Sequence, residues 1–146
     1  MKKMIFEIVL GLTLPTAIFH TQLTDLLSPE KPISKEISYS IARDTNYNEK
    51  VYDMSAASVH IIIFKVRGNK QTILWDKVYG AMQLKKYPTL SNALSQTVTV
   101  HNILDRKEKL FVTYFVTYDS KGSVMQIENG TAVSKGENKG RLTINL

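Results

Sequence analysis

The chain has 146 residues, of which 43% are hydrophobic and 22% are charged, with seven glycines and four prolines. These proportions are typical of one globular domain, and they exclude an intrinsically disordered, collagen-like or low-complexity chain. The formal net charge is +6 and cysteine is absent, which excludes disulfides, thiolate nucleophiles, iron–sulfur clusters and cysteine-ligated zinc.

Residues 1–22 have the order of an export signal or an N-terminal anchor. Lys2 and Lys3 precede a mostly apolar run over residues 4–19. This run is shorter than the roughly 20 residues that cross a bilayer as a helix, and Glu7 interrupts it. The alternative is an amphipathic first helix or a buried strand of a cytoplasmic protein. We expect export to the periplasm, the cell surface or the medium.

Residues 23–34 are expected to form a linker between this segment and the folded domain. Pro29 and Pro32 stand there among polar residues, and proline fits neither a central strand nor a helix interior. The sequence therefore predicts one domain over residues 35–146.

In this domain the dominant hydrophobic period is two, the period of a β-strand. The clearest strand is Lys109–Tyr118 (KLFVTYFVTY), which is rich in β-branched and aromatic residues. Residues 58–66 (SVHIIIFKV) are more uniformly apolar, as expected of a central strand, and residues 71–79 place Ile73 and Trp75 on one face. The other expected strands are 35–42, 96–100, 123–128, 131–134 and 141–146.

Turn residues separate these strands at 67–70, 119–122, 128–131 and 135–140. Asn129-Gly130 fits a type I′ turn, so the strands from residue 109 onward are expected to form an antiparallel meander. Seven or eight strands with little helix predict an all-β fold, namely an antiparallel β-sandwich that is immunoglobulin-like or similar. A small closed β-barrel is the alternative.

No pattern points to catalysis, a cofactor or a metal ion. His60 and His101 lie on separate strands without metal-binding spacing, and His60 is expected to be a packed, hydrogen-bonded side chain. There is no Gly-x-Ser-x-Gly motif and no glycine-rich phosphate loop. We expect no catalytic, cofactor-binding or metal-binding residues, and the enzymatic alternative is a hydrolase whose serine, histidine and carboxylate meet only in space.

Tyrosines in polar segments are the first candidates for a binding surface. Tyr47 and Tyr52 lie in a polar loop over residues 44–57, and Tyr87 precedes Pro88. Tyrosine offers a rigid ring and a hydroxyl group, a combination that interfaces favour.

Basic residues are the second candidates. From residue 65 to the C-terminus, thirteen lysines and arginines face six acidic residues. Lys85, Lys86, Arg106 and Lys107 are expected at strand ends, where they could meet an anionic partner. The alternative is that such lysines only keep strand edges from pairing.

Together these features predict an exported, non-enzymatic β-sandwich whose loops bind another macromolecule, as an adhesin-like, assembly or inhibitor module would. The expected partner is a protein or an anionic cell-envelope polymer, with transient contact at a membrane surface. Nucleic acid is not expected, because few exported domains meet it. The alternative is a carrier of an apolar small ligand in a barrel or an inter-sheet cavity.

Overall fold

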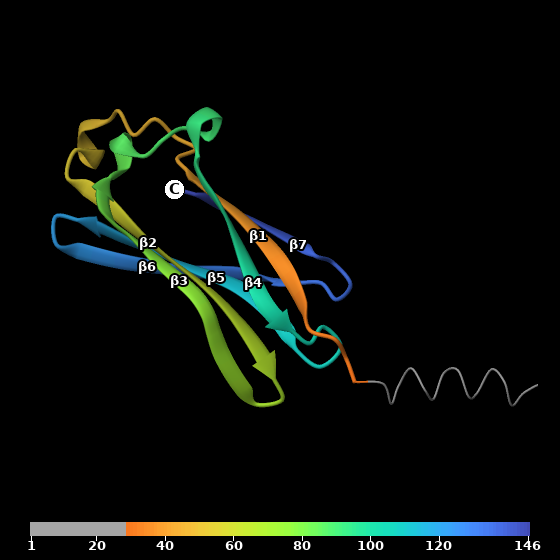
Figure 1. The fold of residues 1–146 in the computed structure, drawn as a ribbon. Helices are drawn as coiled ribbons and strands as arrows, with labels where there is room; N and C mark the ends of the chain where they lie inside the picture. The colour runs from red at the N-terminus through yellow and green to blue at the C-terminus, as the bar shows by residue number, and fades with distance from the viewer. Residues whose placement is uncertain (1–28) are drawn as a thin grey trace, which may run out of the picture. The chain divides into compact units, whose positions relative to one another are not determined.

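Seven strands build two β-sheets that pack against each other (Figure 1). The computed structural model describes residues 29–146, so the predicted leader and the first part of the linker lie outside the described residues. The three-stranded sheet has the order β4-β1-β7 and contains β1 (Ile33–Ala42), β4 (Leu94–Ile103) and β7 (Lys139–Asn145). The four-stranded sheet has the order β3-β2-β5-β6 and contains β2 (Ser55–Arg67), β3 (Lys70–Gln83), β5 (Lys109–Ser120) and β6 (Ser123–Val133).

This arrangement confirms the predicted all-β sandwich, and two separate sheets replace the alternative of a closed barrel. Lys31–Leu146 form one compact unit, and β1 begins at Ile33, inside the segment expected to be a linker. The segment between β3 and β4 holds two single turns of 3-10 helix, Leu84–Lys86 and Leu90–Asn92. A third turn, Lys50–Tyr52, lies between β1 and β2.

The core lies between the sheets because every second side chain of the inner strands points there. The buried residues of β1 include Ile37 and Ile41, and those of β2 include Ile61 and Ile63. Each such aliphatic side chain stabilises the fold by about 1.5–3 kcal/mol relative to an exposed one. The inner face of β5 contributes Leu110, Val112 and Val116, and β7 contributes Leu142 and Ile144.

The prediction of a turn at Asn129-Gly130 is wrong, because β6 is continuous from Ser123 to Val133. Glycine serves here for close approach rather than for a turn: a Cβ on Gly130 would lie 2.6 Å from the carbonyl oxygen of Val112. The true hairpin turn is Lys121-Gly122, where both residues have positive φ angles of 54° and 85°.

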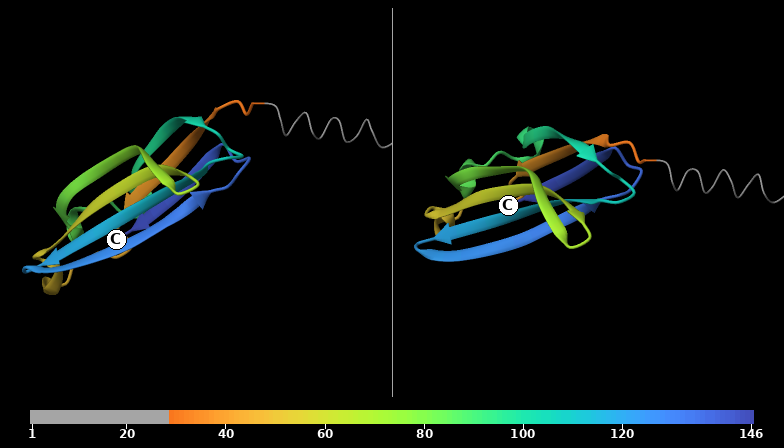
Figure 2. Two further views of the ribbon diagram at one scale, coloured as in Figure 1. Left: turned by 90° about the horizontal axis from the view of Figure 1, so that it is seen from below. Right: turned by 60° about the horizontal axis from the view of Figure 1, so that its bottom comes forward.

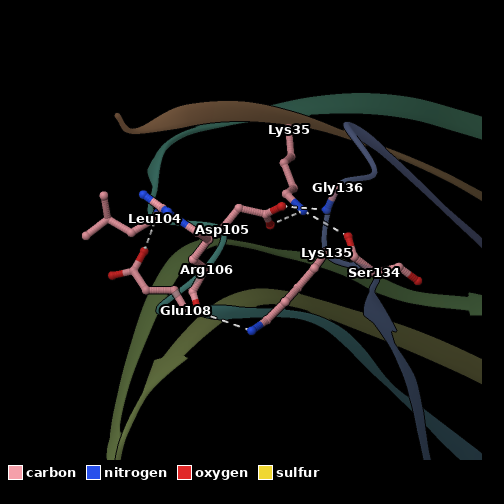
Figure 3. A network of polar contacts seen from close by, with 8 residues as sticks. All are labelled: Lys35, Leu104, Asp105, Arg106, Glu108, Ser134, Lys135 and Gly136. Atoms are coloured by element: carbon pink, nitrogen blue, oxygen red, sulfur yellow. Dashed lines mark hydrogen bonds and ion pairs between the residues drawn. The ribbon is translucent and has the colours of Figure 1, made fainter. Parts of the chain in front are cut away.

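The predicted meander ends after β6, because β7 pairs in parallel with β1 in the other sheet. The crossing segment between β6 and β7 is held by several hydrogen bonds (Figure 3). Among them, the buried Lys35 ammonium donates to the Ser134 carbonyl at 3.0 Å, and Gly136 N–H donates to the Asp105 carboxylate at 2.6 Å. Crossing to the other sheet places the alternating apolar residues of β7 against the core.

A β-bulge in β3 overturns the expected shared face of Ile73 and Trp75. Trp75 pairs with Ile63 and packs against the core, whereas Ile73 pairs with Phe64 and faces outward. One extra residue, Leu74, shifts the alternation between them.

Candidate functional site

An open apolar hollow of about 370 Å³, here called the tyrosine hollow, lies where the β1–β2 loop meets the β5–β6 hairpin. Its loop wall is formed by Tyr47, Val51 and Tyr52. Its hairpin wall is formed by Tyr118 of β5 and by Met125 and Ile127 of β6.

The hollow exists because the hairpin wall faces inward where no strand of the three-stranded sheet covers it. Met125 and Ile127 are paired with Tyr118 and Val116 of β5, so they stand on the inner face of the sheet. The β5–β6 hairpin extends beyond the C-terminal end of β7, as both views in Figure 2 show. Met125 therefore remains 57% exposed and Ile127 43% exposed.

The loop wall is held by an edge-to-face contact between Tyr47 and Tyr52, whose ring centroids are 5.0 Å apart. Tyr47 has a φ angle of 49°, a left-handed conformation that non-glycine residues seldom adopt. The surrounding contacts thus fix the position of this ring.

The hydroxyls of Tyr47 and Tyr118 in the hollow stay neutral at physiological pH, because the pKa of each is raised above its ordinary value. Burial raises the pKa of Tyr47, and the nearby Asp44 carboxylate raises it further. Burial also raises the pKa of Tyr118, with smaller contributions from Tyr47 and Asp44. These hydroxyls can therefore donate hydrogen bonds to a ligand at the rim of an otherwise apolar surface.

The structure places four of the seven predicted binding residues near this hollow and excludes a fifth from the surface. Tyr47 and Tyr52 line it, and the 3-10 turn that contributes Leu84 to its wall also contains Lys85 and Lys86. Lys85 forms an exposed ion pair with Asp53 at 3.0 Å. Tyr87, only 2% exposed, is a core residue instead of a surface contact, and its hydroxyl donates to the Ala57 carbonyl at 2.9 Å.

Arg106 and Lys107 lie at the opposite end of the sandwich, in the β4–β5 loop. The loop is anchored by Glu108, which accepts hydrogen bonds from the Leu104 N–H at 2.9 Å and from the Lys65 ammonium at 3.0 Å. The four predicted basic residues thus form two separate pairs and no single cationic surface.

A smaller hollow of about 220 Å³ at this second end has mostly charged walls, formed by Lys65, Arg67, Lys70, Thr72 and Glu108. Another hollow, of about 490 Å³, is an open polar trough on the outer face of the three-stranded sheet. Ser38, Ser40, Thr97 and Arg141 are among its lining residues.

Neither described histidine meets a serine and a carboxylate together. His101 Nδ1 lies 2.8 Å from Ser34 Oγ, and His60 Nε2 lies 3.4 Å from the Asp76 carboxylate. The expectation of a hydrogen-bonded His60 is wrong for Nε2, which has no hydrogen-bond partner. His60 lies on the outer face of β2, beside Phe115.

Within residues 29–146, no three His, Asp or Glu side chains converge on a point where they could hold a metal ion. In the same part of the chain, no helix has the length and hydrophobicity needed to span a membrane.

Three further residues of the hollow are not predicted from the sequence: Tyr118, Met125 and Ile127. Alternation in β5 and β6 identifies the face on which they stand, but only the packing of the other sheet decides whether that face is covered. The only sign of the site in the sequence was the group of apolar residues Val124, Met125 and Ile127 in β6.

No family model, no curated protein and no solved structure matches this chain.

Proposed function

We propose that this protein is an exported, non-enzymatic β-sandwich that binds another protein through the tyrosine hollow. The observation that carries the proposal is an open apolar hollow of about 370 Å³ whose walls include three tyrosines. Soluble proteins seldom leave such surfaces in water unless a ligand or partner covers them.

The surroundings of the hollow favour a polypeptide over an anionic polymer. Val51 and Met54 extend the apolar surface along the β1–β2 loop and are 59% and 66% exposed. The neutral tyrosine hydroxyls can donate to backbone carbonyls, and the Lys85–Asp53 pair supplies a polar rim. An apolar centre with tyrosines and a polar rim is the usual composition of a protein interface.

The export part of the proposal rests on the sequence of residues 1–22. The pair Arg106 and Lys107 at the other end offers a secondary contact with an anionic envelope polymer or a membrane surface. A carrier of an apolar small ligand is the competing function, because the same apolar walls would accept one.

The test compares two matched valine variants of the purified chain. Val51→Asp places a charge in the hollow, whereas Val78→Asp places the same charge at a similarly exposed position on β3, where Val78 is 62% exposed. Proteins captured from cell-envelope extract by the wild type and by each variant are compared by quantitative mass spectrometry. We expect at least one protein that the wild type and Val78→Asp capture and Val51→Asp loses, with direct binding confirmed by calorimetry on purified components.

Equal capture by all three chains would contradict a role of the hollow in protein binding. Uptake of a fluorescent fatty acid that Val51→Asp abolishes, without any protein that distinguishes the variants, would establish the carrier function instead.

A further inference from the structure

β6 is an edge strand whose backbone hydrogen-bonding groups are only half used. It pairs with β5 on one side, and all its residues except Val133 are exposed. Lys121-Gly122 forms a two-residue turn, so Ser120 and Ser123 are a hydrogen-bonded pair. Every second residue from Ser123 onward therefore bonds to β5, and the residues between them direct their N–H and C=O groups outward.

In one half of β6, two of the four outward backbone groups have a local hydrogen-bond partner, whereas in the other, open half none has one among the described residues. Gly130 N–H donates to the Asn129 side chain at 2.7 Å, and the Ala132 carbonyl accepts from the Thr131 hydroxyl at 3.4 Å. Among the described residues, no hydrogen bond is made to the outward backbone groups of the remaining three, Val124, Gln126 and Glu128.

The open half also lacks the usual protection of a sheet edge. It contains no proline and no lysine, and Glu128 is its one charged residue. β3, at the other edge of the same sheet, carries Lys70, Asp76 and Lys77. Natural proteins use charges of this kind to keep free edges from pairing.

The open half can pair with a second copy of itself in one antiparallel register that uses all three open residues. In this register Gln126 faces Gln126 of the second copy, and Val124 faces the second copy's Glu128. The outward backbone N–H and C=O groups of all three open residues then form hydrogen bonds with the second copy. Met125 then faces the second copy's Ile127 on the inner side of the sheet. A shift by two residues places Glu128 opposite the second copy's Gly122 in the hairpin turn, or Val124 opposite Gly130, whose N–H already donates to the Asn129 side chain. Only the unshifted register therefore uses all three open residues, so it is favoured.

We propose that the open half of β6 is the interface of a homodimer, in which two four-stranded sheets join across a two-fold axis at Gln126. The interface is isologous, because each copy contributes the same segment. Directly opposite residues of an antiparallel pair lie on one face, so the two tyrosine hollows stand on the same side of the joined sheet. The dimer does not depend on what the hollow binds.

The test uses two lysine substitutions on the same strand, with the full chain studied by sedimentation equilibrium at low salt over a range of concentrations. Gln126→Lys places two ammonium groups opposite each other and is expected to weaken the dimer by about tenfold or more. Val124→Lys places each new lysine opposite the second copy's Glu128, so the dimer is expected to be as tight as the wild type or tighter.

Circular dichroism and thermal melting check that both variants are folded. A monomer at every concentration of the wild-type chain would overturn the proposal. Equal weakening by Val124→Lys and Gln126→Lys would also overturn it, because it would indicate unspecific association through exposed apolar side chains. A third variant, Gln126→Pro, removes an outward N–H from the proposed interface and should also weaken the dimer while the chain stays folded.

Discussion

Lys35 of β1 and Asp105 of the β4–β5 loop form an ion pair in which the lysine side chain is 1% exposed (Figure 3). The same ammonium donates to the Ser134 carbonyl, and the same carboxylate accepts from the Gly136 N–H. One buried lysine therefore ties the first strand to two of the four connections that carry the chain between the sheets, the β4–β5 loop and the β6–β7 segment.

Removing one member of this pair is expected to lower the free energy of unfolding more than removing both members. Asp105→Ala leaves the Lys35 ammonium buried without its carboxylate, and we expect a loss of about 3–5 kcal/mol in the free energy of unfolding. The double variant Lys35→Met, Asp105→Leu removes both charges, so its free energy of unfolding should fall less than that of Asp105→Ala. Urea denaturation measures both values, and equal losses would show that the pair acts only through packing.

Stability is expected to fall in acid because two loop carboxyls ionise easily in the folded state. Burial alone would raise the pKa of Asp105, but Lys35 and the Gly136 N–H more than offset it and lower the pKa. For Glu108, burial is likewise outweighed by the Leu104 N–H and Lys65.

Because the folded pKa values lie below the unfolded ones, about 4, these carboxylates stabilise the fold above that pH. This stability is lost as the pH falls through the folded values. Urea midpoints recorded from about pH 7 to pH 2 should show a decline that is shallower in the double variant Asp105→Asn, Glu108→Gln. An unchanged slope would contradict the assignment to these two groups.

Two glycines should respond differently to alanine. A Cβ on Gly130 would lie 2.6 Å from the backbone oxygen of Val112, so Gly130→Ala must displace a strand and is expected to cost about 1–3 kcal/mol. Gly80 on β3 has open space around it, and Gly80→Ala should change the free energy by less than about 1 kcal/mol. Thermal melting of the two variants distinguishes these outcomes.

The two faces of β5 should differ in their contribution to stability. Leu110 is buried between the sheets, so Leu110→Ala is expected to cost about 2–5 kcal/mol. Phe115 lies half-buried on the outer face next to His60, and Phe115→Ala should cost only about 1 kcal/mol. A larger loss at Phe115 than at Leu110 in chemical denaturation would mean that the outer face is covered in solution.

The two basic pairs should contribute unequally to polyanion binding. Arg106 and Lys107 share their end of the sandwich with Arg67 and Lys70, and these additional cations strengthen the positive field at that end. Neutralising Arg106 and Lys107 to glutamine should therefore lower the salt concentration that elutes the chain from immobilised dextran sulfate more than neutralising Lys85 and Lys86. Melting temperatures should barely change, and identical elution shifts would refute this difference.

Alternation along the chain predicted the strands, apart from dividing β6 in two, and it predicted which residues of β5 share a face without deciding which face is the inner one. Leu110 and Val112 are buried as the period of two requires, and Gly122 supplies the positive φ angle of the β5–β6 turn. These are local properties, because a pleated strand and a two-residue turn are set by neighbouring residues. The turn predicted at Asn129-Gly130 was wrong because that prediction was also local. The preference of these two residues for a turn is overridden by their pairing with β5.

The sequence alone determined an all-β chain with alternating faces and a surplus of basic residues in its C-terminal part. Only the tertiary structure decided that β7 pairs with β1, that Tyr87 is buried, and that Tyr118, Met125 and Ile127 join Tyr47 and Tyr52 in one hollow. Those outcomes depend on which faces of distant strands cover one another. Burial of a side chain is a property of its partners in space, and alternation along one strand does not specify those partners.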